Sequence, residues 1–413
     1  MNKPKPFTQF FWGASTAAHQ VEGNNHNSWS VWETKNAHKL AKNAHKRFGH
    51  LPSWLHIQKE AEDPQTYISG EGPDHYTLYP EDIMHMQTLG LNSYRFSLEW
   101  SRIEPEEGVW NHDEIEHYRQ KIRALRAQGI EPLVTLWHWT NPVWFQEQGG
   151  WESVKAVFQF SRYVEFVAKE LGEDVNYWIV LNEPLVYSVQ SYLDGAFPPQ
   201  KKNFFAYSHV INTLIVSQYR AYAIIKKIHP DSQVGTTVNL VHHVALDDAL
   251  RTRFTIKMLR LWDTRFLRLT IPAMDFIGMN YYFRTKIKGF AIQHSSRYQS
   301  DLGWGLYPNG IYHVLKDLKQ FNKPIIITEN GLADATDTYR GWWITETINA
   351  IRRARNEGVP VMGYMHWSLL DNFEWDKGYW ARFGLIQVDL KTKKRTIRTS
   401  AYVYKDLIEK VGW

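Results

Sequence analysis

The chain has 413 residues and a formal net charge of +5, with 48 Lys and Arg against 43 Asp and Glu. It has no cysteine, which excludes disulfides and thiolate catalysis. The basic residues are scattered among the acidic ones, and the two denser runs, 39–47 and 391–395, are typical of solvated surfaces, so nucleic acid is not expected as a partner.

No apolar run reaches membrane-spanning length, and the opening stretch "MNKPKPFTQFFWG" lacks the apolar core of a signal peptide. We therefore expect a cytoplasmic protein with no membrane partner. No linker or low-complexity tract divides the chain, so residues 1–413 are predicted to form one domain. The 19 Trp residues fit either an aromatic core or flat platforms for a ligand such as a sugar.

Three segments, 81–97, 113–136 and 346–367, repeat one design in which an amphipathic stretch runs into a glycine and then into an apolar strand. Gly90, Gly129 and Gly358 fit the left-handed position that follows the last turn of a helix. Helices that alternate with strands apolar on both faces favour a parallel sheet.

Eight such strands are predicted along the chain. They are Phe10–Ala14, Ser93–Ser97, Pro132–Leu136, Trp178–Leu181, Gln233–Val238, Asp275–Met279, Pro324–Thr328 and Val361–Met365, of which the fifth is the least apolar. Eight strands alternating with helices indicate an α/β fold of the (β/α)8 TIM-barrel type. The alternative, an open doubly wound sheet, lacks a G-x-G-x-x-G turn between a strand and a helix.

Polar and aromatic side chains gather where the predicted strands end, which in this fold is the active-site face. They are Arg95, Glu99 and Trp100; Trp137, His138 and Trp139; Asn182 and Glu183; Asn280, Tyr281 and Tyr282; Glu329; and His366, Trp367, Glu374 and Trp375. A capped strand end explains any one of these groups, but it explains six ends together poorly.

Glu183 and Glu329 each follow an apolar strand, the fourth and the seventh. Two carboxylates facing one lumen suit glycoside hydrolysis, in which one protonates the leaving oxygen and the other meets the anomeric carbon. A separation of about 5–5.5 Å permits direct attack and retention of configuration, whereas about 6.5–9.5 Å leaves room for water and gives inversion.

At these residues the chain resembles glycoside hydrolase family 1, the retaining β-glucosidase and β-glycosidase family, over nearly its whole length. The resemblance rests on seven blocks in order: "FFWGASTAAHQVEG" (10–23), "YRFSLEWSRI" (94–103), "TLWHWTNPVWF" (135–145), "LNEP" (181–184), "GMNYY" (278–282), "ITENG" (327–331) and "HWSLLDNFEWDKGYWARFG" (366–384).

The resemblance implies that Glu183 is the general acid/base and Glu329 the nucleophile. Arg95 and Tyr282 match the neighbours that keep the nucleophile ionised, and Asn182 matches the donor to the sugar 2-hydroxyl. Glu183 has to arrive protonated, so we expect its pKa to be raised by the charge of Glu329 and by burial.

The resemblance also implies a pocket for the non-reducing sugar and no cofactor or metal. Its matching residues are Gln20, His138, Trp139, Asn280, Trp367, Glu374 and Trp375. Members that act on 6-phosphoglycosides carry Ser, Lys and Tyr where this chain has Glu374, Ala381 and Phe383, so a phosphorylated substrate is not expected. The partner implied is a small β-glycoside, and the oligomeric state is left open.

Residues 35–70 match no pattern of the family and read as an atypical insertion after the first strand. We expect this segment, through Trp54, His56 and Tyr67, to shape the leaving-group site, unless it is a peripheral helical insertion. Its histidines have no metal-ligand spacing. Glu99, the rival carboxylate, is expected to pair with an arginine such as Arg102. A non-catalytic sugar-binding protein on the same barrel is the alternative function, which retention of both carboxylates disfavours.

Overall fold

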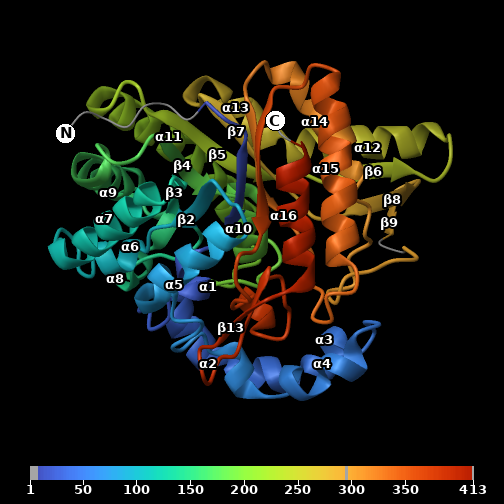
Figure 1. Cartoon of the computed structure of the whole chain (residues 1–413), viewed down its shortest axis with the longest axis horizontal. Coiled ribbons are helices and arrows are strands. Elements are labelled where there is room, and N and C mark those ends of the chain that lie inside the picture. The colour runs from blue at the N-terminus through green and yellow to red at the C-terminus, as the bar shows by residue number, and fades with distance from the viewer. Residues whose placement is uncertain (1–7, 294–295, 412–413) are drawn as a thin grey trace.

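The computed structural model of the chain describes residues 8–293 and 296–411. Eight parallel strands close into a barrel in the order β1-β11-β10-β7-β5-β4-β3-β2 (Figure 1). They are β1 (Phe11–Ser15), β2 (Ser93–Ser97), β3 (Glu131–Trp137), β4 (Tyr177–Asn182), β5 (Gln233–Asn239), β7 (Phe276–Tyr281), β10 (Ile325–Asn330) and β11 (Val361–Trp367). All eight predicted strands are present, and the barrel is confirmed.

A ring of helices surrounds the barrel, at least one after each strand (Figure 1). The outer helices are α5 (His75–Thr88), α7 (His112–Ala127), α9 (Ala156–Leu171), α11 (Phe204–Ile228), α13 (Arg265–Thr270), α14 (Gly310–Leu318), α15 (Arg340–Asn356) and α16 (Thr399–Val411). Gly90, Gly129 and Gly358 follow α5, α7 and α15 at φ angles of +70°, +71° and +78°. This is the left-handed conformation that their predicted role requires.

Several strands run further toward their carboxyl ends than the apolar pattern predicts. β10 continues through Glu329 and Asn330, and β7 continues through Asn280 and Tyr281. The prediction that Glu329 follows its strand is therefore wrong, because the parallel ladder extends through polar residues: Glu329 is in register with Asn280 of β7. Glu183 does follow β4 directly, as predicted.

The barrel interior is closed beneath the strand ends. Seven buried side chains form a separate apolar cluster there: Phe11, Leu133, Tyr177, Ile179, Phe276, Ile326 and Met365. Each comes from a barrel strand, and Phe11 and Tyr177 make an edge contact with ring centroids 5.0 Å apart. The lumen is thus a filled core rather than a channel.

The connection from β1 to β2 carries α1 (Ala18–Val21), α2 (Ser28–Lys42), α3 (Ala44–Phe48), α4 (Trp54–Ala61) and the 3-10 helix η1 (Pro64–Tyr67). The predicted insertion boundary at residue 35 falls inside α2, so the unusual segment does not begin at an element boundary. In Figure 1 the helices α2, α3 and α4 lie along the lower edge of the molecule.

The remaining elements complete the fold. They are α6 (Trp100–Ile103), α8 (Val143–Glu147), α10 (Pro184–Tyr192), α12 (Leu250–Asp263), η2 (Gly150–Glu152), η3 (Ile271–Ala273), η4 (Lys319–Phe321), η5 (Trp375–Lys377), β6 (His242–Ala245), β8 (Arg284–Lys288), β9 (Ala291–Gln293), β12 (Ile386–Val388) and β13 (Arg395–Ile397). Strands β6, β8 and β9 form a small sheet outside the barrel. No helix within the described ranges is long and apolar enough to cross a membrane.

Candidate active site

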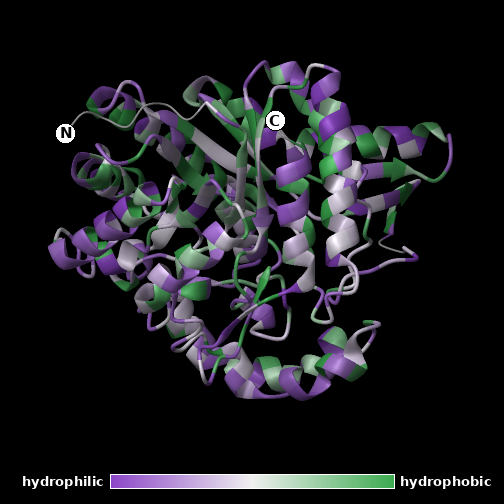
Figure 2. Ribbon diagram, in the orientation of Figure 1, coloured by the Kyte–Doolittle hydropathy of each residue, from purple (hydrophilic) through white to green (hydrophobic). Residues whose placement is uncertain are grey.

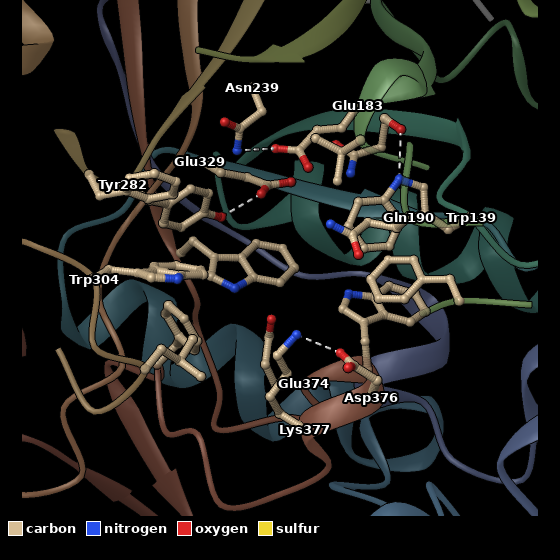
Figure 3. Close-up of a pocket in the computed structure, with 18 of the residues that line it drawn as sticks. Trp139, Glu183, Gln190, Asn239, Tyr282, Trp304, Glu329, Glu374, Asp376 and Lys377 are labelled. Atoms are coloured by element: carbon tan, nitrogen blue, oxygen red, sulfur yellow. Dashed lines mark hydrogen bonds and ion pairs between the residues drawn. The ribbon is translucent and has the colours of Figure 1, made fainter. Parts of the chain in front are cut away.

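A cavity of about 440 Å³ opens among the carboxyl ends of the barrel strands and the loops that follow them. Glu183 and Glu329 both line it, and Figure 3 shows their carboxylates pointing into the same space. They come from strands three places apart around the barrel, β4 and β10. Both side chains are almost fully buried.

Glu329 is held on both carboxylate oxygens. The guanidinium of Arg95, on β2, forms an ion pair with Oε1, and the hydroxyl of Tyr282 donates to Oε2 at 2.6 Å (Figure 3). Burial and the two nearby carboxylates raise the pKa of Tyr282 well above its ordinary value, so its phenol keeps the proton that it donates. A cation and a hydrogen-bond donor on one carboxylate favour its charged form.

Glu183 sits in a different environment. Its Oε1 accepts hydrogen bonds from Asn280 at 2.7 Å and from Asn239 at 3.1 Å, and it has no ion pair with a described residue. Burial, followed by the charge of Glu329, raises its pKa to about 8. The two carboxyl groups that share one cavity thus differ in environment, since Glu183 has a raised pKa and no ion pair in the described part of the chain whereas Glu329 is paired with Arg95, which is the arrangement that a proton donor and a nucleophile require.

The backbone of Glu183 is also unusual. Its φ of +43° and ψ of 55° lie in the left-handed region, and Pro184 starts α10 directly after it. A non-glycine residue in this region costs on the order of 1–3 kcal/mol and persists only where its surroundings fix it. The turn aims the Glu183 side chain into the cavity at the point where β4 ends.

Asn182 is locked in one orientation. Its Oδ1 accepts from the Arg95 guanidinium and from the Thr237 hydroxyl, both at 2.6 Å. Its Nδ2 therefore faces the other way and donates to Nε2 of His138 at 2.9 Å. The second hydrogen of this amide is left for a ligand beside Glu183.

Two buried polar atoms next to the cavity have no partner among the described residues: Nδ1 of His138 and Oε1 of Gln20. Burial and then the charge of Arg95 lower the pKa of His138 well below its ordinary value, so the ring is neutral. Because Nε2 accepts from Asn182, the ring hydrogen lies on Nδ1. The site thus offers one unused donor and one unused acceptor, which a hydroxylated ligand would satisfy.

Glu374 lies directly before η5, in the loop that follows β11. Burial raises its pKa to about 8, and Gln20 Nε2 donates to it at 3.4 Å. Asp376, two residues on, takes both nearby cations: Arg47 Nη2 at 2.5 Å and Lys377 Nζ at 2.6 Å. Glu374 is thereby kept free of ion pairs with the described residues and available to hydroxyl groups.

Four tryptophans line the cavity, of which Trp139, Trp367 and Trp375 were predicted. Trp139 and Trp375 have φ angles of +74° and +49°, which bulky residues rarely adopt, so these walls are built under strain. Trp139 Nε1 donates to the Asn182 carbonyl at 2.9 Å, which ties one wall to the end of β4. Gly331, after β10, leaves room for the Trp367 carbonyl, since a Cβ there would lie 1.8 Å from that oxygen.

The structure brings the predicted residues together. Nine line the cavity: His138, Trp139, Asn182, Glu183, Tyr282, Glu329, Trp367, Glu374 and Trp375. The other three do not line the cavity but contact residues that do. Gln20 donates to Glu374, Arg95 to Glu329 and Asn280 to Glu183.

Some residues of the site were not predicted. Asn239 closes β5, the least apolar strand, and contacts Glu183; its position at a strand end was the signal that could have found it. Thr237, two residues earlier, orients Asn182. Further lining comes from Val186, Gln190, Phe197, Phe283, Leu302, Trp304, Asp376, Lys377 and Phe383.

The segment after β1 does reach the cavity, but through other residues than those expected. Arg47, Phe48, His50 and Leu51 line it, while Trp54, His56 and Tyr67 do not. Trp54 belongs to an apolar cluster that includes Phe48, and the Tyr67 hydroxyl donates to the Ala61 carbonyl at 2.7 Å. These side chains hold the segment together, whereas His56 is exposed.

The expected pairing of Glu99 with Arg102 is also wrong. Arg102 forms ion pairs with Glu22 at 3.4 Å and Glu114 at 3.6 Å. Glu99 instead accepts from the hydroxyls of Ser101 and Thr140, and it does not line the cavity. Neutral donors satisfy this carboxylate, so it needs no cation.

A (β/α)8 barrel with two unequal carboxyl groups in one strand-end cavity defines an enzyme of the glycoside-hydrolysing class. In residues 8–293 and 296–411, no three His, Asp or Glu side chains are grouped to hold a metal ion.

Comparison with known proteins agrees with this class. The family model "Glycosyl hydrolase family 1" matches residues 4–255 and 262–413. Beta-glucosidase A of Acetivibrio thermocellus is 32% identical, with 98% of each chain covered. A beta-glycosidase structure from Pyrococcus horikoshii is 32% identical with a TM-score of 0.85, covering 98% of this chain and 95% of that one. A beta-glucosidase structure from Thermotoga maritima in complex with glucoimidazole is 27% identical with a TM-score of 0.83, and both chains are fully covered.

The chain belongs to glycosyl hydrolase family 1, and it is a β-glycoside-hydrolysing enzyme.

Proposed function

We propose that the protein is a retaining exo-β-glycosidase that removes terminal non-reducing β-D-glucosyl residues, with β-galactosides and β-fucosides as further substrates. The observation that carries the proposal is the difference between the two carboxyl groups. Glu329 is bound by Arg95 and Tyr282, whereas Glu183 has a pKa of about 8. Relatives named beta-glucosidase and, in Sulfolobus acidocaldarius, beta-galactosidase support the choice of sugars.

In the first step, ionised Glu329 attacks the anomeric carbon and forms a glycosyl ester. The bond to the leaving oxygen breaks, and Glu183 gives that oxygen its proton. The second hydrogen of the Asn182 amide meets the sugar 2-hydroxyl, a contact that strengthens in the transition state. In the second step, the ester has removed the Glu329 charge, so Glu183 is more acidic and stays ionised. It then takes a proton from water while the water oxygen attacks the anomeric carbon; the ester bond to Glu329 breaks, which releases the sugar and restores the Glu329 carboxylate.

The exo mode is supported by the closed barrel floor. The apolar cluster that includes Leu133, Ile179 and Ile326 fills the lumen, so a sugar chain has no passage through the barrel. Only the end of a chain fits such a site. The unpartnered acceptor of Gln20 and donor of His138 then discriminate among sugars, because a missing hydroxyl would leave them buried and unpaired.

The stereochemistry of the first-formed sugar tests this proposal. Proton NMR of an aryl β-glucoside digest is expected to show β-glucose first and the α-anomer only as mutarotation proceeds. Early α-glucose would mean inversion and would contradict the double displacement. Absence of turnover on aryl β-glucosides, galactosides and fucosides would favour a sugar-binding protein instead.

The raised pKa of Glu183 predicts that activity on substrates with poor leaving groups declines at alkaline pH. Below about pH 8 the group holds the proton that a poor leaving group needs, and above that pH the proton is lost. We expect kcat/KM for a phenyl or alkyl glucoside to fall as pH rises through about 8. The 2,4-dinitrophenyl glucoside, which leaves without protonation, should lack this limb. An identical limb for both substrates would assign it to another group, such as Glu374, whose pKa is also near 8.

We also propose that the leaving group binds against the segment after β1. Phe48 and Leu51 of that segment face the same cavity as Phe283, Leu302 and Trp304. This part of the wall is apolar and aromatic, so it suits alkyl or aryl leaving groups.

Leu51→Ala tests the leaving-group site. Removing this half-buried side chain is expected to lower kcat/KM for octyl glucoside about fivefold and to leave 2,4-dinitrophenyl glucoside within about twofold. Leu55→Ala is the matched control, because Leu55 lies on the same segment, is 84% exposed and does not line the cavity. Equal effects of the two variants on octyl glucoside would make the segment peripheral.

A further inference from the structure

Helix α12 (Leu250–Asp263) is the least buried long helix of the outer layer, since Thr252 is its only buried residue. It packs on β6 and β8 of the small outer sheet, and Figure 1 shows this unit projecting from the side of the barrel. The family model skips residues 256–261 in the middle of this helix. Met258 and Leu261 therefore lie outside the part of the chain that the family model matches.

One side of α12 is apolar and open. Leu250, Phe254, Met258 and Leu261 follow one another at helical spacing and are 83%, 58%, 48% and 40% exposed. Trp262 continues the row at 36% exposure. Figure 2 shows hydrophobic and hydrophilic residues alternating along this helix.

Neighbouring elements extend this apolar row. The Gly289 N–H donates to the Thr252 hydroxyl at 2.7 Å, which sets the β8–β9 turn against the first turn of α12. Phe290 and Ile292 beside that turn are 76% and 48% exposed. In the described part of the chain, 21 large apolar side chains are classed as exposed, and nine of them lie between residues 246 and 292.

The surroundings of the row are basic. Arg253, Lys257 and Arg260 form an adjoining exposed row on α12. Residues 241–290 hold nine Lys and Arg against four Asp and Glu, which gives +5, the formal net charge of the entire chain. Arg253 and Arg260 have partners, Asp248 and Asp317, but these pairs are at least 47% exposed on each side chain and contribute little.

We propose that α12, the β8–β9 turn and their apolar row dock the enzyme on an anionic lipid surface. A helix that exposes a row of Phe, Leu, Met and Trp beside a row of Arg and Lys is the type that lies in the membrane interface. A second copy of this chain meeting the same face would bring like charges together. This proposal departs from the expectation of no membrane partner, and it concerns surface contact rather than insertion.

Vesicle sedimentation tests the proposal on the whole protein. The protein is expected to sediment with vesicles of phosphatidylglycerol and phosphatidylcholine in equal amounts at low salt. Affinity should fall about tenfold or more with phosphatidylcholine alone or at high salt, because each basic residue near an anionic surface contributes about a fivefold gain.

Matched variants locate the contact. Phe254→Ser/Met258→Ser should lower vesicle affinity about tenfold or more through lost apolar burial. Val154→Ser/Phe158→Ser, which alters side chains 92% and 68% exposed elsewhere, should leave it unchanged. Arg253→Glu/Lys257→Glu should also lower vesicle affinity. Lys391→Glu/Lys394→Glu changes the net charge by the same amount and should leave vesicle affinity unchanged. Thermal unfolding checks that each variant is folded.

A second copy of the chain or an acidic polypeptide on this face would give different results in these experiments. A dimer in sedimentation velocity that Phe254→Ser/Met258→Ser dissolves, without vesicle binding, would assign the face to a second copy. Binding to polyglutamate that ignores the apolar substitutions would assign it to an acidic polypeptide. Either result, or equal binding to neutral and anionic vesicles, would overturn the proposal.

Discussion

Replacing Glu329 with glycine is expected to lower hydrolysis of every β-glycoside, activated or not, by about 10⁴-fold or more, because no covalent intermediate can then form. Azide should partly restore turnover, since it fits the space left by the carboxylate. It would attack from the same face as Glu329 and give the α-glycosyl azide, with inverted configuration. The product is identified by NMR.

Glu329→Gln separates chemistry from folding. Glycine at 329 leaves Arg95 without its carboxylate, although its contacts to Asn182 and Thr135 remain. Glutamine keeps the volume and should lose activity to a similar extent with a smaller change in melting temperature. Glu99→Gln is the comparison carboxylate, for which activity should stay within about tenfold. Substantial activity in Glu329→Gly without azide would show that the nucleophile is another group.

Glu183→Ala is expected to produce a loss that depends on the leaving group. For phenyl or alkyl glucosides kcat/KM should fall about 10²–10⁴-fold, because the leaving oxygen no longer receives a proton. For 2,4-dinitrophenyl glucoside kcat/KM should stay within about tenfold, while kcat falls because water is no longer activated in the second step.

Azide distinguishes the two carboxylates by stereochemistry. In Glu183→Ala it should attack the glycosyl ester on Glu329 and give the β-glycosyl azide, with retained configuration. The wild-type enzyme should give none, because the ionised Glu183 repels the anion. If both variants yield the same anomer, or if Glu183→Ala affects all leaving groups equally, the division of roles between Glu183 and Glu329 is wrong.

The barrel could be predicted because its signals are local. A glycine after each amphipathic stretch and an apolar run after the glycine follow from helix termination and burial. β5 was the least certain strand for a physical reason: Thr236 and Thr237 are fully buried but polar. They are satisfied by Gln218 and Asn182, at 2.6 Å each, and hydropathy along a chain cannot reveal such pairing.

The centre of the site could be predicted because parallel strands bring their carboxyl ends to one face. The rim could not. Arg47 reaches the cavity because it binds Asp376, 329 residues away, and Phe48 because it packs on Trp380 with ring centroids 5.0 Å apart. Such contacts depend on how two loops meet, so the residues expected from the segment were the wrong ones.

One guanidinium, that of Arg95, holds both the carboxylate of Glu329 and the amide of Asn182. In the proposed mechanism, attack on the sugar and recognition of its 2-hydroxyl therefore depend on the same side chain, and a change that displaces Arg95 should weaken both. We expect that substitutions in the loops around the mouth of the barrel, where Arg47, Leu51 and Trp304 lie, change the range of leaving groups without this penalty.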